Sequence, residues 1–134
     1  MTAFDDVWDS SRTNCWTPFY PVVIAIGVLV LIRVSFIKPV IKRRLIKVAS
    51  FVVLTATATV ASSLAIGEKW RIRHEWTDTH AEILTDDQRM ASISDGANLA
   101  FGPILLGCQA LVIFTGVLLA LSIATRLGKK WSTG

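Results

Sequence analysis

Three side chains with metal-binding chemistry follow one another at helical spacing in the most polar stretch of the chain. His74, Asp78 and Glu82 stand four residues apart, which places them on one face of a helix. Imidazole and carboxylate groups bind divalent transition metals, so this face is a candidate metal site. The stretch contains no defined metalloenzyme motif such as HExxH. The same face also suits solvated helical charge pairs such as Arg71–Glu75, and we favour this second interpretation.

Small residues at helical spacing form a second pattern, which is typical of packed membrane helices. It comprises two series, namely Thr55, Thr59, Ser63 and Gly67, followed later by Gly116, Ala120 and Ala124. Small side chains let two membrane helices approach closely, and hydroxyl groups can hydrogen-bond across the interface. The hydroxyls can instead bond to a carbonyl in their own helix. We favour a helix-packing interface, and the sequence leaves open whether the partner helix belongs to this chain or to another.

Few other side chains offer chemistry. Gln109 is the only strongly polar residue deep in an apolar run, where an interhelical hydrogen bond is favoured over a polar path. Cys15 and Cys108 belong to different predicted segments and are not expected to form a disulfide with each other. No apolar run contains Asp, Glu or His, which argues against an ion-coupled carrier. No catalytic or cofactor-binding motif is present, so we expect neither an enzyme nor a bound cofactor.

The elements that would position these residues follow from the distribution of apolar residues. These make up 52% of the chain and gather in three blocks, with the charged residues between them. A bilayer is crossed by about 20 apolar residues in a helix. We therefore predict an all-α integral membrane protein with three transmembrane helices, at residues 18–37, 48–67 and 99–125. The third run is longer than a bilayer requires, so it should tilt, or bend near Gly102–Pro103.

The orientation follows from a short basic loop at residues 38–47, KPVIKRRLIK, which has five basic residues and no acidic one. Short basic loops remain on the cytoplasmic side. The segment 1–17 is then extracytoplasmic and interfacial, and the tail 126–134 is cytoplasmic. Nine basic and no acidic residues fall inside, whereas five basic and ten acidic residues fall outside, which together give the net charge of +4. The charge is thus a topology signal rather than a sign of nucleic-acid binding, and it favours a bacterial inner membrane.

The loop at residues 68–98 is predicted to be helical and extracytoplasmic. Thr85 and Gln88 fit a capping box at the start of a helix. Asp95–Gly96 fits a helix stop. Nothing interrupts the helical pattern after Gly67, so the second span can also continue outward as one long helix. We expect a helical hairpin, or two short helices lying over the bundle.

These features favour a single membrane domain without catalytic chemistry. We expect an accessory, structural or regulatory subunit whose partners are the lipid bilayer and either other membrane helices or further copies of itself. The alternative is a membrane pore former. Three spans, an outer N-terminus and a basic inner tail are similar to the layout of three-span phage holins, although this chain has a longer outer loop. The resemblance lies in topology alone and implies a pore-forming function.

Overall fold

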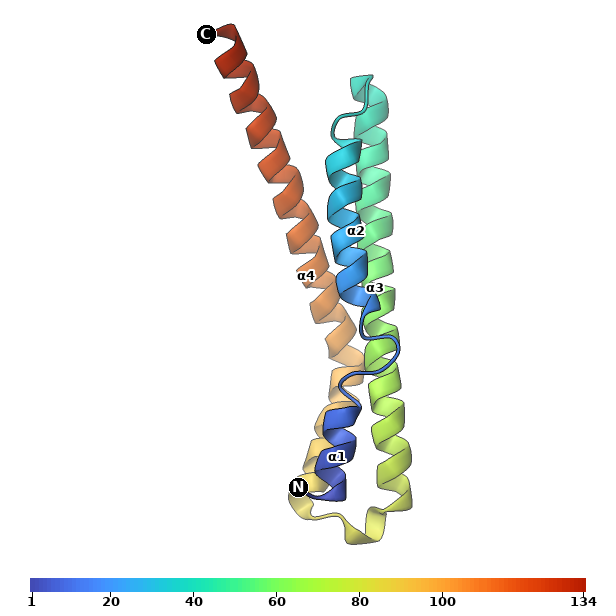
Figure 1. Ribbon diagram of the computed structural model, residues 1–134. Coiled ribbons are helices and arrows are strands. Elements are labelled where there is room, and N and C mark those ends of the chain that lie inside the picture. Colours follow the sequence, from blue (N-terminus) through green and yellow to red (C-terminus); the bar gives the residue numbers. More distant parts are fainter.

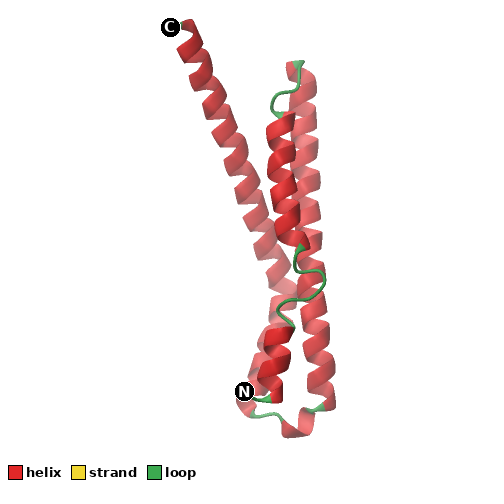
Figure 2. Ribbon diagram, viewed as in Figure 1, coloured by secondary structure: helices red, strands yellow, loops and turns green.

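The computed structural model describes residues 1–134 and is entirely helical (Figures 1 and 2). The four α-helices are α1 (Ala3–Ser10), α2 (Phe19–Val34), α3 (Val40–Thr79) and α4 (Asp86–Thr133). A short 3-10 helix, η1 (Ala81–Ile83), joins α3 to α4. The prediction of an all-α chain is confirmed.

The two long helices α3 and α4 form an antiparallel hairpin that extends along the whole molecule (Figure 1). At about 1.5 Å per residue, the 40 residues of α3 extend about 60 Å and the 48 residues of α4 about 72 Å. Both contain an apolar stretch long enough to cross a membrane, whereas α2 is a shorter apolar helix of 16 residues. In Figure 1, α2 lies along one half of α3 and α1 lies beside the other half of the hairpin.

Two capping boxes fix where helices begin. The Thr2 hydroxyl accepts a hydrogen bond from the Asp5 backbone N–H, and Asp5 accepts one from Thr2. Thr85 and Gln88 make the same reciprocal pair at the start of α4. Each box satisfies backbone N–H groups that have no partner inside the helix. The predicted capping box at Thr85 is therefore confirmed.

The helices are longer than the sequence pattern indicated. The predicted stop at Asp95–Gly96 is wrong, because α4 runs through it without a break. A glycine inside a helix costs only about 1 kcal/mol, and here the side chain of Asp95 is buried in a tertiary contact. The option of a continuous outward helix is the one observed, because α3 reaches Thr79. Residues 126–133 of the basic tail also belong to α4.

A small core joins α2, α3 and α4. Leu31 from α2, Ala58 from α3, and Ala110 and Phe114 from α4 are fully buried there. Phe114 fits because Gly27 of α2 has no side chain: a Cβ at that position would lie 2.7 Å from the Phe114 ring. Beyond Phe114 no residue of α4 is buried, and Figure 1 shows this end of α4 leaning away from α2 and α3.

Candidate functional site

The most elaborate side-chain site lies in the polar hairpin, which we define as residues 68–98 of α3, η1 and α4. Its centre is an ion pair between Arg73 of α3 and Asp95 of α4, with 2.6 Å between Arg73 Nη1 and Asp95 Oδ1. The exposed fractions of these side chains are only 8% and 6%. The pair therefore joins the two long helices in a place that water scarcely reaches.

Arg73 also holds the N-terminal segment against the hairpin. Its Nε donates to the Ser11 hydroxyl at 2.7 Å, and its Nη2 donates to the Trp8 carbonyl at 2.8 Å. The guanidinium carbon stands 4.7 Å from the centre of the Trp8 ring, which is cation–π distance. One side chain thus connects α1, α3 and α4. Each of its three nitrogens donates a hydrogen bond within the chain, so it is a joint between helices rather than an open ligand site.

Aromatic rings cover this joint. Phe4 stacks on Trp8 with ring centres 4.0 Å apart and meets Trp76 edge-on at 5.9 Å. Phe4 is buried and the other two rings are half-buried, so these aromatic contacts attach α1 to α3. The linker that follows α1 is fastened separately, because Asn14 Nδ2 donates to the Ala65 carbonyl of α3 at 2.9 Å.

The charges around the joint differ in how far they are buried. Burial lowers the pKa of Lys69, one turn before Arg73, because it disfavours the charged ammonium; the charge of Asp95 acts in the opposite direction. On the exposed side, hydrogen bonds from Arg71 lower the pKa of Glu68. Arg71 also pairs with Glu75 at 2.7 Å, which is the helical charge pair expected from the sequence.

Three large apolar side chains are exposed near the tip of the polar hairpin, on η1 and the first turns of α4, and we call this set the apolar patch. It consists of Ile83, Met90 and Ile93, whose exposed fractions are 69%, 62% and 68%. Met90 and Ile93 stand three residues apart on α4, and Ile83 comes from the adjoining η1. Ile93 also borders a shallow hollow between α3 and α4 that His74 and Leu84 help to line. This patch occurs where the sequence is otherwise most polar.

The candidate metal residues do not form one face. His74 Nε2 lies 3.3 Å from Asp78 Oδ2, so these two side chains form a pair on the surface of α3. Glu82 belongs to η1, beyond the end of α3 at Thr79, so the four-residue spacing does not extend to it. No three ligating side chains gather in the way a metal ion requires. The three side chains therefore do not share the helix face on which the prediction of a metal site depended.

The first series of small residues takes several different environments. Thr59 packs against α4: a Cβ on Gly107 would lie 2.6 Å from the Thr59 hydroxyl oxygen. The Thr59 hydroxyl itself donates to the Thr55 carbonyl in its own helix. Ser63 is exposed, and a Cβ added to Gly67 would meet no atom within 4 Å. The apolar part of α3 instead buries a neighbouring face of the helix, formed by Ala58, Ala61, Ser62 and Ile66.

The second series is exposed along its whole length. Gly116, Ala120 and Ala124 lie on the part of α4 that leans away from the bundle, and nothing approaches the Cβ position of Gly116 within 4 Å. The close approach of α4 to α3 instead uses Gly102 and Gly107, which contact Ile66 and Thr59. An interface between the second series and another chain stays a prediction.

Gln109 makes the kind of contact that the sequence favoured. The Tyr20 hydroxyl of α2 lies 2.8 Å from Gln109 Oε1 and 3.0 Å from the Leu106 carbonyl of α4. This contact connects α2 with α4. Cys15 and Cys108 are both free and exposed.

Sequence reasoning missed the Arg73–Asp95 pair. Arg73 counted only as a basic residue on the outer side, and Asp95 as part of a helix stop. The sequence places acidic and basic residues in both predicted helices of the hairpin, which allows an ion pair between the helices. It does not specify the axial register of the two helices, so the paired residues could not be predicted.

Fold and site together define an all-helical protein with two helices long and apolar enough to cross a membrane, joined at a polar hairpin by a buried ion pair. Comparisons with protein-family models, with curated proteins and with solved structures found no match. Any function must therefore be argued from the geometry.

Proposed function

We propose that this chain is a non-catalytic membrane subunit that crosses the bilayer three times and presents the polar hairpin to a partner protein outside. The observation that carries the proposal is the apolar patch of Ile83, Met90 and Ile93. Exposed apolar side chains are ordinary where lipid covers a helix, but on a water-exposed surface a cluster of them marks an interaction site.

The proposed placement in the membrane is supported by exposed apolar side chains on the surfaces of the helices. On α2, Val22, Ile26 and Leu29 are exposed to between 48% and 66%, which suits contact with lipid. At about 1.5 Å per residue α2 measures about 24 Å, so a few flanking residues must complete a crossing of about 30 Å. A bilayer placed around α2 also covers the apolar parts of α3 and α4, and it leaves the polar hairpin in water.

The proposed orientation puts the polar hairpin and α1 outside and the basic α2–α3 connection in the cytoplasm. It is supported by the charge distribution, since no acidic residue occurs between residues 10 and 67 or after Asp95. We propose a bacterial inner membrane as the location, which is one of the membranes in which basic loops remain on the cytoplasmic side.

A rigid support for the patch strengthens the subunit proposal. Arg73 fastens α1 and the two long helices together a few turns from the tip. A partner that binds a surface already fixed by internal contacts loses less conformational entropy than one that binds a mobile loop. The polar hairpin is therefore suited to docking on an extracytoplasmic surface of a larger membrane complex.

The experiment compares two variants by native gel electrophoresis of membranes solubilised in a mild detergent. We expect the parent to migrate in a complex larger than its own oligomer. Met90→Glu/Ile93→Glu should release it, because two carboxylates would be buried unpaired in the interface. The exposed Ser94→Glu, on the same helix, is the matched control and should leave the complex intact. Identical migration of the parent and the double variant would refute the proposal.

The holin-like alternative predicts a different result in the same cells. A pore former should collapse the membrane potential when it accumulates, and the patch variant should affect this little because the pore would lie in the membrane. An unchanged potential at high membrane levels, read with a voltage-sensitive dye, would exclude the pore.

A further inference from the structure

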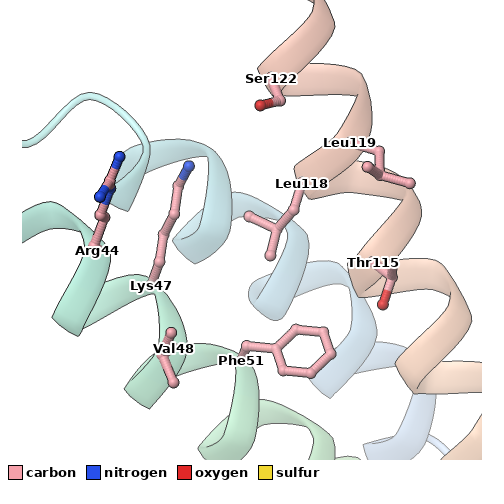
Figure 3. Close-up of a pocket in the computed structure, with 8 residues that line it drawn as sticks. All are labelled: Arg44, Lys47, Val48, Phe51, Thr115, Leu118, Leu119 and Ser122. Atoms are coloured by element: carbon pink, nitrogen blue, oxygen red, sulfur yellow. The ribbon is translucent and has the colours of Figure 1, made fainter.

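A cleft opens between α3 and α4 at the basic end of the molecule (Figure 3). Its volume is about 570 Å³. In Figure 3, Phe51 extends from α3 and Leu118 from α4 toward the space between the helices, and Ser122 lies on α4 farther along it. The cleft exists because α4 leans away beyond Phe114, its last buried residue.

Two cations lie at one end of this cleft, both on its α3 side. Arg44 and Lys47 of α3 line it, and their side chains extend past the apolar residues in the same direction (Figure 3). A second hollow of about 240 Å³ shares Lys47 and Ser122 with the first and adds three more cationic residues, Lys38, Arg43 and Lys129. The cleft is therefore apolar along its length and positively charged at one end.

The chain supplies no counter-charge for these cations. None of the five forms an ion pair, since every ion pair in the chain involves Arg12, Arg71, Arg73 or His74. The acidic residues nearest in sequence are Asp9, Glu68 and Asp95, all on or next to the polar hairpin at the other end of the molecule. Concentrated positive charge beside a low-dielectric apolar wall attracts an anion that carries its own apolar part.

We propose that this cleft binds one anionic phospholipid. Its phosphate lies at Arg44 and Lys47, and its acyl chains lie along Phe51 and Leu118. Basic pockets between membrane helices on the cytoplasmic side are suited to anionic head groups. The inference rests on the proposed membrane orientation, which puts this end of the bundle at the cytoplasmic leaflet, but not on the proposed partner.

Two other occupants fit the cleft less well. A second copy of this chain inserted in the same orientation would bring its own basic segment to the same level, where like charges repel. A soluble phosphate would satisfy the cations but leave the apolar wall uncovered, where Val48 and Leu119 are 65% and 60% exposed.

The test uses the full chain in a neutral detergent and measures lipid binding by native mass spectrometry and by the midpoint of thermal unfolding. The probes are phosphatidylglycerol, phosphatidylcholine with the same acyl chains, and glycerol phosphate without chains. We expect one phosphatidylglycerol to remain bound and to raise the midpoint, with neither effect from the other two probes.

Variants locate the binding site. Arg44→Gln/Lys47→Gln should weaken phosphatidylglycerol binding at least tenfold. Lys42→Gln/Lys130→Gln removes the same charge from residues that line neither hollow, and it should leave binding unchanged. Thr115→Phe keeps every charge but fills the cleft, and it should also abolish binding.

Other outcomes would overturn the inference. Equal weakening by both charge pairs would mean general attraction to a basic surface. An equal effect of glycerol phosphate would indicate a phosphate site, and a dimer that persists without lipid and is lost in Thr115→Phe would indicate a second copy. The isolated chain needs no partner for this measurement, so failure here is separate from failure of the Met90→Glu/Ile93→Glu experiment.

Discussion

Arg73 shows how one buried side chain can organise a small helical protein. It bonds to Asp95 near the start of α4, and to the Trp8 carbonyl and the Ser11 hydroxyl at the end of α1. Taking a guanidinium and a carboxylate out of water costs several kcal/mol for each ion, and this cost is offset only when the charges stay paired and hydrogen-bonded. The ion pair therefore contributes more to fixing which residues meet than to the free energy of unfolding.

Removing one member of the pair should be severe. We expect Asp95→Ala to lower the free energy of unfolding by about 3–5 kcal/mol, because it leaves the Arg73 charge buried and unpaired. Chemical unfolding in detergent, followed by the fluorescence of Trp8 against a background with the other tryptophans replaced, reports both stability and the release of α1.

Two controls test the reason for that loss. Arg71→Gln breaks two exposed pairs only two residues away and should have little effect on stability, because solvent screens exposed ion pairs. Arg73→Met/Asp95→Leu removes both charges and should recover most of the stability lost in Asp95→Ala. A double variant as unstable as the single one would show that the charges are not the cause.

Among the helices, the contact between α3 and α4 depends on glycines at particular positions. Gly102 and Gly107 lie against Ile66 and Thr59, and a Cβ at either position would come within 2.6 Å of the neighbouring side chain. Lipid provides no hydrophobic force between helices, so close packing of this kind must hold them together.

The glycines of α4 should therefore differ sharply in how well they tolerate replacement by a larger residue. We expect Gly107→Val to lower the free energy of unfolding by about 1–3 kcal/mol, because it overpacks the contact with Thr59. Gly116→Val introduces the same group where nothing lies within 4 Å, and it should have little effect on the isolated chain. Unfolding of both variants in detergent provides the measurement, and equal losses would contradict the assigned contact.

Across the whole molecule, α1 and the polar hairpin lie at one end of an elongated bundle and the basic α2–α3 connection lies at the other (Figure 1). A helical bundle with an apolar middle and two charged ends has a preferred orientation in a membrane, because basic segments remain in the cytoplasm. The orientation can therefore be measured with a single residue near each end.

Cys15 provides the outer probe. In intact cells we expect Cys15 to react with a membrane-impermeant maleimide, since its side chain is exposed next to α1. Ser132→Cys in a Cys15→Ser/Cys108→Ser background should remain unlabelled until the membrane is opened, and the Cys15 measurement likewise uses a Cys108→Ser background. Labelling of position 132 but not of position 15 in intact cells would reverse the proposed topology.

The helical class, the long apolar stretches and the start of α4 after Thr85 could all be predicted from the amino-acid sequence. Each of these depends on residues close together in the chain: hydrophobic length, charge patterning and a capping box within four residues. Gln109 stood out in the sequence because a polar side chain in an apolar run needs a hydrogen-bonding partner. That this partner is Tyr20 could not be predicted, because Tyr20 lies in another helix.

The way in which the faces of the helices meet depends instead on tertiary packing. Asp95–Gly96 looked like a helix stop, yet the helix continues because Asp95 is buried against Arg73. Thr59 lies in the α3–α4 contact while Ser63, one turn later, is exposed. The residues of α3 that meet α4 are Thr59, Ile66 and Arg73, at intervals of seven, and the row of small residues at intervals of four turns away from that line. The pairing of Arg73 with Asp95 depends on the axial register of two helices, and that register results from packing along their whole contact rather than from any local spacing.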